Sequence, residues 1–152
     1  MPDYQVYHDV PCIRQPESNA CWFASLSMLV RYWRERGGRG ALIDPALDPV
    51  AVRLLRANRG ITWNQALDLI QRLGFSWTQV STNADTLFGL LQRHPLIFAG
   101  IGAGGAQGHW VVFRGMCRNV LWINDPRSDT PVMADFLTFL SQAPPWNRLF
   151  IH

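Results

Sequence analysis

The chain of 152 residues contains no lysine, so all fourteen of its basic side chains are arginines. These arginines are scattered along the sequence without forming a basic run, and the formal net charge is only +3. Nucleic-acid-binding domains concentrate their positive charge on one face or in one segment. The charge pattern therefore gives no reason to expect nucleic acid as a partner.

Cysteine is also scarce, and its three positions are Cys12, Cys21 and Cys117. An odd number without metal-ligand spacing argues against a disulfide framework and gives no zinc-site pattern. We expect Cys12 and Cys117, which lie in apolar strand-like segments, to be core residues. We expect no metal site and no organic cofactor.

Long apolar segments are missing as well. No run reaches the length of a membrane span, and the N-terminus lacks the pattern of a signal peptide. The hydrophobic fraction of 48% and the charged fraction of 16% are ordinary for a folded globular chain. We therefore expect one domain over residues 1–152 that is made in the cytoplasm without a signal peptide and has no membrane partner.

The stretch Gln15–Trp33 organises the rest of the chain. A polar, turn-forming run, Pro16–Asn19, stops before Cys21, where an amphipathic helix begins. We expect Ser18 or Asn19 to cap this helix. Cys21 then lies in the first turn, where unpaired N–H groups and the helix dipole favour a thiolate, which is the nucleophilic form. The alternative is a buried core cysteine, and this stretch alone does not decide between the two.

The spacing of apolar residues along the rest of the chain predicts most helices before most strands. We expect helices at 21–36, 50–57, 63–73, 84–93 and 134–140, and strands within 1–13 and at 75–80, 96–101, 109–115, 120–125 and 148–151. This order indicates an α+β domain whose two halves face each other. The glycine loop 102–108 does not fit a phosphate-binding loop, since it leads into a strand. We expect His8 at the surface and His94 exposed or capping at a helix end.

Three further residues can serve the chemistry of a Cys21 thiolate. His109 starts a strand after the glycine loop, and Asp125 ends the next strand. A short turn at 118–119 would make these strands antiparallel neighbours, which brings the imidazole beside the carboxylate. His109 could then deprotonate the Cys21 thiol. The Gln15 side chain and the Cys21 backbone N–H could both donate to an oxyanion.

The pattern resembles the papain-like cysteine proteases. In both, a glutamine is followed after five residues by Cys-Trp at a helix start, and later come a Gly-His strand and a carboxylate or amide after another strand. CWFAS at 21–25 is similar to the Cys-Trp-Ala-Phe-Ser signature of that family. Residues 10–33 resemble the AvrRpt-type avirulence proteases, and residues 95–128 are similar both to those and to the bacteriocin-processing peptidase domains of ABC exporters. The segment 39–80 shows no such resemblance.

The resemblance implies a papain-like cysteine protease fold, in which an N-terminal helical half with the nucleophile helix packs on a C-terminal antiparallel sheet. It implies Cys21 as nucleophile, His109 as base and acid, Asp125 as the group that orients His109, and Gln15 as an oxyanion donor. Papain has asparagine in the third place, and Asn124 is the neighbour of Asp125. Because neighbours on a strand face opposite sides, only one can serve, and the Asp-Pro match favours Asp125.

Three residues are expected to line the substrate cleft. Trp22 and Trp110 are expected to pack around the site, and Gly108 ends the glycine loop that suits a mobile rim. Exporter peptidases usually have glycine after the nucleophile, so Trp22 favours the effector-like branch of the resemblance.

We therefore expect a cysteine endopeptidase that acts as a bacterial effector or toxin, is secreted or injected, and cleaves one particular protein in a target cell. The short chain leaves no room for a pro-segment, and a monomer is expected. A cognate immunity protein or inhibitor is a further candidate partner. One alternative keeps the same thiol for amidase, deamidase, transglutaminase or cell-wall peptide hydrolase activity, and another is an inactive module that binds a peptide.

Overall fold

The computed structural model describes residues 5–37, 39–101, 108–142 and 147–152. Its helices are α1 (Cys21–Arg36), the short 3-10 helix η1 (Pro45–Leu47), α2 (Pro49–Ala57), α3 (Trp63–Leu73), α4 (Ala84–Arg93) and α5 (Phe136–Gln142). Its strands are β1 (Gln5–Tyr7), β2 (Trp77–Gln79), β3 (Leu96–Ile101), β4 (Trp110–Cys117), β5 (Val120–Asn124), β6 (Val132–Asp135) and β7 (Asn147–Ile151). The predicted α+β class is confirmed. Within these ranges, no helix is long and apolar enough to cross a membrane.

Helix α1 begins at Cys21 as predicted, but neither Ser18 nor Asn19 caps it. The residue before the helix is Ala20, and no side chain of the described residues accepts a hydrogen bond at this helix start. Both residues expected to cap α1 are bonded elsewhere, because Ser18 and Asn19 are hydrogen-bonded to Asn58 at the end of α2. The start of the helix is therefore held by a neighbouring element and not by its own cap.

Helices α2 and α3 each begin after a residue whose side chain caps the helix. The Asp48 carboxylate accepts a hydrogen bond at the start of α2, and Thr62 and Gln65 form a reciprocal capping box at the start of α3. Gly74 ends α3 with a φ of 92°. A Cβ at this position would lie 2.7 Å from the Ala41 carbonyl oxygen, so glycine is required there.

The strands of the described part form one antiparallel sheet in the order β2–β7–β3–β4–β5–β6, and β1 pairs with β4. The predicted turn between β4 and β5 is present, with Arg118 in the left-handed region at φ 55°. Val112 lies opposite Asn124 in the register, which brings the start of β4 and the end of β5 to the same edge. Strand β6 was not predicted, because its pattern is mostly exposed and has no alternation.

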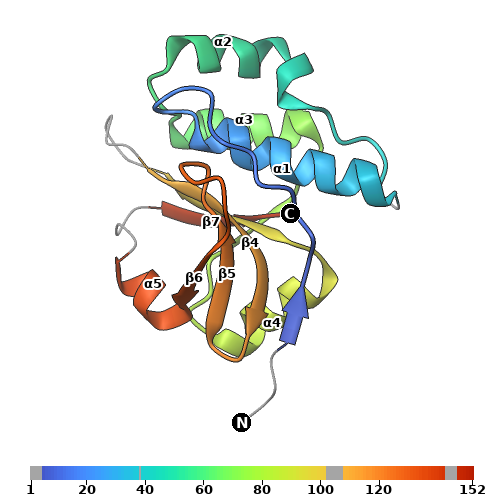
Figure 1. The fold of residues 1–152 in the computed structure, drawn as a ribbon. Coiled ribbons are helices and arrows are strands. Elements are labelled where there is room, and N and C mark those ends of the chain that lie inside the picture. Colours follow the sequence, from blue (N-terminus) through green and yellow to red (C-terminus); the bar gives the residue numbers. More distant parts are fainter. Residues whose placement is uncertain (1–4, 38, 102–107, 143–146) are drawn as a thin grey trace.

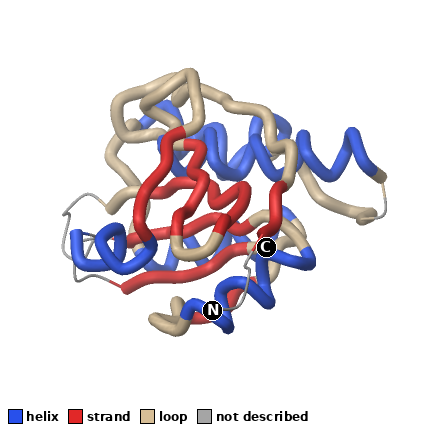
Figure 2. Tube along the Cα trace, turned by 60° about the horizontal axis from the view of Figure 1, so that its bottom comes forward, coloured by secondary structure: helices blue, strands red, loops and turns tan. Residues whose placement is uncertain are grey.

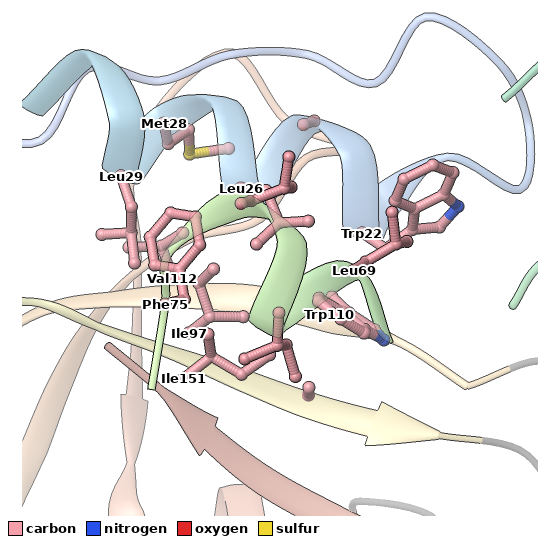
Figure 3. Packing of buried hydrophobic residues seen from close by; sticks show 14 of the residues in the cluster. Trp22, Leu26, Met28, Leu29, Leu69, Phe75, Ile97, Trp110, Val112 and Ile151 are labelled. Carbon is pink, nitrogen blue, oxygen red and sulfur yellow. The ribbon is translucent and has the colours of Figure 1, made fainter. Parts of the chain in front are cut away.

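The helices cover the sheet in two groups (Figures 1 and 2). Helices α1, α2 and α3 lie together at the top of Figure 1, and α4 and α5 lie towards the bottom. Each group has its own buried cluster. One cluster joins α1 and α3 to β3, β4 and β7, and the other joins α4 and α5 to β3, β4 and β5. In Figure 3, Leu26 and Leu29 of α1 lie above Val112 and Ile97 of the sheet, which fixes α1 against the strands.

Three side-chain placements differ from the expectations. Cys117 is exposed and Cys12 is only half-buried, so the prediction that both are core residues is wrong. Cys117 is the last residue of β4, where the buried pattern of that strand ends. His8 was expected at the surface but is buried, because its ring is hydrogen-bonded to the Tyr32 hydroxyl and the Leu91 carbonyl oxygen.

Candidate active site

Cys21 is the first residue of α1 and lies in the wall of a cavity of about 520 Å³. Its residue is mostly buried, with 8% exposed. The Ala24 N–H donates to the Ala20 carbonyl at 3.2 Å, so the first helical hydrogen bond is formed. The remaining N–H groups of the first turn carry no side-chain cap among the described residues. Together with the helix dipole they favour negative charge at the end of the helix where the thiol lies.

His109 and Asp125 meet as the hairpin predicts. His109 directly precedes β4, Asp125 directly follows β5, and the two strands are paired. The His109 Nε2 atom lies 3.1 Å from Asp125 Oδ1, and both side chains are largely covered, with 29% and 20% exposed. Because Nε2 is engaged by the carboxylate, Nδ1 is the ring nitrogen left to face Cys21.

The charges of the three groups are coupled. Burial by itself lowers the pKa of His109, but hydrogen bonds and charge interactions with Asp125 and Cys21 outweigh it and raise that pKa to about 9. Burial likewise raises the pKa of Asp125, but its hydrogen bonds to His109 and Arg127 hold that pKa well below its ordinary value. At neutral pH the imidazole is therefore protonated and the carboxylate is charged.

Arg127 is a partner of Asp125 that sequence reasoning missed. Its backbone N–H donates to Asp125 Oδ1 at 3.0 Å, and its guanidinium lies 3.2 Å from Oδ2. The carboxylate is thus held between the imidazole on one side and the turn after β5 on the other. The signal was present, because an aspartate commonly bonds the backbone two residues later in a turn.

Asn124 faces away from His109 and has a different task. It is 1% exposed, its Oδ1 accepts from Arg114 Nη1 at 3.0 Å, and its Nδ2 donates to the Val10 carbonyl at 3.0 Å. Arg114 is itself buried, with 4% exposed. Asn124 therefore ties the N-terminal segment to the sheet and leaves the place beside His109 to Asp125.

Gln15 lies in the wall of the same cavity as Cys21. Its side-chain Nε2 donates to the Glu17 carbonyl at 2.9 Å and the Ser18 carbonyl at 2.8 Å. Its Oε1 is buried and has no hydrogen-bond partner among the described residues. Both N–H groups are thus engaged by the loop that leads to Cys21, and the oxyanion role of Gln15 stays a prediction.

The cavity is lined both by Cys21 at the start of α1 and by His109 before β4. Its walls include all three residues expected to line a substrate cleft, namely Trp22, Gly108 and Trp110. Trp22 and Trp110 are each 2% exposed, so their rings mainly pack. Figure 3 shows that they come from α1 and from the sheet respectively. The part of the glycine loop expected to form a mobile rim, residues 102–107, lies outside the described residues.

This arrangement is suited to nucleophilic attack by sulfur. A thiol sits beside an imidazole, the imidazole is held by a carboxylate, and a helix N-terminus faces the same cavity. The imidazole can take the thiol proton and later return it to a leaving group. Among the residues that the structure describes, no group of three or more His, Cys, Asp or Glu side chains could hold a metal ion.

The sequence profile of the papain-like cysteine protease AvrRpt2 family matches residues 5–142. The chain belongs to this family. It is a cysteine peptidase with a papain-like fold, so the fold and the activity class expected from the resemblance are confirmed. No curated protein sequence matches the chain.

Two solved structures are similar to this peptidase along nearly the whole chain. The peptidase domain of Streptococcus ComA, a bifunctional ABC transporter of a quorum-sensing pathway, is 21% identical with a TM-score of 0.59, and 94% of this chain and 96% of that chain are covered. A C39-like peptidase from Bacillus anthracis is 15% identical with a TM-score of 0.65, and 97% of each chain is covered. At these identities the likeness shows the fold.

The sequence of this peptidase did not predict which residues form the helical wall of the cavity. Residues from the end of α2 to the start of α3 line it: Leu54, Ala57, Arg59, Gly60, Ile61, Thr62 and Gln65. They fall in the segment 39–80, which showed no resemblance to a known family. The available signal was the Asn58-Arg59-Gly60 sequence after an amphipathic helix, which is typical of a left-handed helix end.

Proposed function

We propose that this peptidase hydrolyses a peptide bond of a protein substrate with Cys21 as the nucleophile, His109 as the base and acid, and Asp125 as the group that holds His109. The observation that carries the proposal is that Cys21 and His109 line one cavity while His109 Nε2 lies 3.1 Å from the Asp125 carboxylate. The high pKa of His109, about 9, supports an imidazolium partner for the thiolate.

Acylation follows from this geometry. The Cys21 sulfur attacks the scissile carbonyl carbon, a C–S bond forms, and the carbonyl oxygen becomes an oxyanion. The Cys21 backbone N–H, at the start of α1, would donate to that oxygen. When the intermediate collapses the C–N bond breaks, and the His109 imidazolium gives its proton to the departing amine. The product is a thioester on Cys21.

Deacylation reverses these roles. His109, now neutral, takes a proton from water, the water oxygen attacks the thioester carbonyl, and the C–S bond breaks to return the thiolate. Gln15 would contribute to both oxyanions by turning one N–H from the Glu17 or Ser18 carbonyl towards the cavity. A donor of this kind is worth about 10²–10³-fold in turnover.

The biological role that fits this chemistry is that of a bacterial effector or toxin, secreted or injected, that cleaves one protein in a target cell. The family match and the resemblance of residues 10–33 to avirulence proteases support it. We further propose that the enzyme works as a monomer and has a cognate immunity protein or inhibitor. Light scattering of the purified protein and inhibition by proteins encoded beside it test these two points.

The decisive experiment compares the wild-type protein with Cys21→Ala in bacterial and plant lysates by proteome-wide mass spectrometry. New protein N-termini produced only by the wild type are the expected result, and they also give the cleavage motif. Glutamine residues changed by the mass of deamidation, without new termini, would replace peptide hydrolysis by amide chemistry on the same thiol. Absence of both in lysates and on cell-wall peptides would reject the proposed function.

A further inference from the structure

The loop Pro16–Ala20, which leads into the nucleophile, depends on other parts of the fold for its shape. No side chain caps α1, so the loop has no anchor at its own helix. On the sheet side, the Gln15 backbone N–H donates to the Pro126 carbonyl at 2.8 Å, in the turn that follows Asp125. On the helical side, the loop is bound by Asn58 at the end of α2.

Asn58 makes three hydrogen bonds to two consecutive loop residues. Its Oδ1 accepts from the Asn19 backbone N–H at 2.9 Å, and its carbonyl accepts from Asn19 Nδ2 at 2.7 Å. Its Nδ2 lies 3.0 Å from Ser18 Oγ and donates to it. Backbone and side chain of the loop are therefore fixed together, two residues before Cys21.

The backbone of Asn58 is suited to this contact. It is left-handed, with φ 49° and ψ 43°, and its N–H donates to the Leu54 and Leu55 carbonyls as α2 ends. Asparagine is one of the few residues with a side chain that tolerates this conformation. The turn aims both the amide and the carbonyl of Asn58 at the loop, and neither residue of the loop caps α1.

We propose that Asn58 is a positioning residue of the active site. It holds Ser18 and Asn19 and thereby fixes the loop from which the Cys21 N–H reaches the reacting carbonyl, as would the Gln15 side chain once one of its N–H groups has turned from its loop carbonyl. The link to Gln15 is direct, because Gln15 Nε2 bonds the Ser18 carbonyl at 2.8 Å. This inference rests on the proposed function, since an oxyanion develops only when the thiolate attacks a carbonyl.

Two reagents separate the oxyanion donors from the thiolate itself. Iodoacetamide is attacked at its methylene carbon; a C–S bond forms, iodide leaves, and no oxyanion develops. p-Nitrophenyl acetate is attacked at its carbonyl carbon, passes through an oxyanion, and releases p-nitrophenolate while the acetyl group stays on sulfur. The ratio of the two rates at Cys21 therefore reports the oxyanion donors and is insensitive to the folded fraction.

The variants follow from the three hydrogen bonds. Asn58→Gly keeps the left-handed turn but removes both side-chain bonds, and Asn58→Asp keeps an acceptor for the Asn19 N–H. The matched control is Asn83→Ala, because Asn83 caps α4 through its side chain far from the loop in sequence. Losing that cap lowers the Tm of the protein without touching the loop.

We expect Asn58→Gly to lower the acylation rate by about tenfold, because small misplacements of reacting groups have large effects on rate. Its alkylation rate should stay within about twofold of wild type. Asn58→Asp should restore most of the acylation rate, since it keeps one of the two side-chain bonds to the loop that Asn58→Gly loses. Asn83→Ala should leave the ratio unchanged. An unchanged ratio in Asn58→Gly, or equal loss in Asn58→Gly and Asn58→Asp, overturns the inference.

Failure of the proposed function and failure of the positioning role give different results in these assays. A wild-type protein that is acylated normally but cuts no protein would reject peptide hydrolysis and leave the ratio test intact. A wild-type Cys21 that is alkylated but never acylated would overturn the positioning role, because no oxyanion donors would then be in place.

Discussion

The two walls of the cavity are built in different ways. On the strand side, Asp125 is bonded to His109 and Arg127, and its neighbour Asn124 is bonded to Arg114. On the helical side, Thr62 and Gln65 bond the backbone of their own helix start, and Arg59 lines the cavity without a hydrogen-bond partner among the described residues. The groups proposed for the chemistry thus lie where side chains bond one another, and the opposite wall is held by local backbone bonds.

The contrast is sharpest within the dipeptide Asn124-Asp125. One residue faces the core and joins the N-terminal segment to the sheet, and the other faces the cavity and holds the imidazole. We therefore expect adjacent residues of one strand end to divide stability and catalysis between them, because successive side chains point to opposite faces. The following predictions test this division and the difference between the walls.

Replacing Asp125 by alanine should have the largest effect. The imidazole loses the acceptor that fixes its orientation, so kcat/KM should fall by about 10²–10⁴-fold while the protein stays folded. Steady-state kinetics on a cleaved peptide and a thermal melt measure the two properties.

Asn124→Ala should give the opposite profile. Removing the amide takes away the acceptor of Arg114 Nη1 and the donor to the Val10 carbonyl, while Arg114 Nη2 keeps its bonds to Tyr7 and Asp9. The loss should cost roughly 1–3 kcal/mol of folding free energy, seen as a lower Tm. Its kcat/KM should stay within about threefold of wild type, since no bond to His109 is lost. A larger loss of activity in Asn124→Ala than in Asp125→Ala would reassign the third member of the site.

The pH profile of kcat/KM should be bell-shaped, rising as the thiolate forms and falling as the imidazolium loses its proton. The alkaline limb should lie near pH 9, because the pKa of His109 is raised to about 9. In Asp125→Ala this limb should move to lower pH, since burial then lowers the pKa of His109 with less opposition. A limb that stays in place in the variant contradicts the coupling.

The same shift predicts a dependence of stability on pH. The pKa of His109 in the folded protein lies above its ordinary value of 6.5, so its interactions stabilise the fold fully below that pH. This contribution is lost as the pH rises from 6.5 towards 9. The Tm difference between wild type and His109→Ala should therefore shrink over this interval, which a melt series in matched buffers records.

Arg127→Ala tests the outer support of Asp125 and should have a modest effect. The Arg127 side chain is 65% exposed, and the backbone N–H of residue 127 still bonds the carboxylate in the variant. We expect kcat/KM to fall by about two- to fivefold, as befits an exposed ion pair. High salt should reduce wild-type activity towards that of the variant, because salt screens this pair.

Thr62→Ala tests the helical wall and should have the smallest effect on activity. Thr62 caps α3 through the Gln65 N–H, so its loss should lower stability by about 1 kcal/mol. Because Thr62 also lines the cavity, KM should change by about twofold at constant kcat. A change confined to kcat would show that this wall takes part in the chemistry.

Local signals made the strand side and α1 predictable from the sequence. Helix α1 follows from its amphipathic period, and the meeting of His109 with Asp125 follows from a short turn between two apolar runs. The capping box Thr62–Gln65 and the cap Asn83 are also local, and the structure contains both. Each of these features depends on residues close together in the chain.

Three residues that were misplaced, Ser18, Asn19 and His8, depend on distant partners. Ser18 and Asn19 look like caps, but their donors and acceptors are taken by Asn58, nearly forty residues away. The sequence predicts His8 at the surface, but the fold brings Tyr32 and Leu91 within hydrogen-bond distance of its ring. A polar side chain near a helix end has several ways to be satisfied, and only the tertiary contacts decide which one is used.

The two-sided anchoring of the loop before Cys21 also bears on synthesis of the enzyme. Cys21 is synthesised before Asn58, His109 and the turn at Pro126, which follow it in that order. Until the turn at Pro126 has emerged, the sheet-side anchor of the loop is missing and the carboxylate beside His109 has no turn to hold it. A chain that ends before Pro126 should therefore lack an assembled active site, and the purified truncated protein should cleave no peptide.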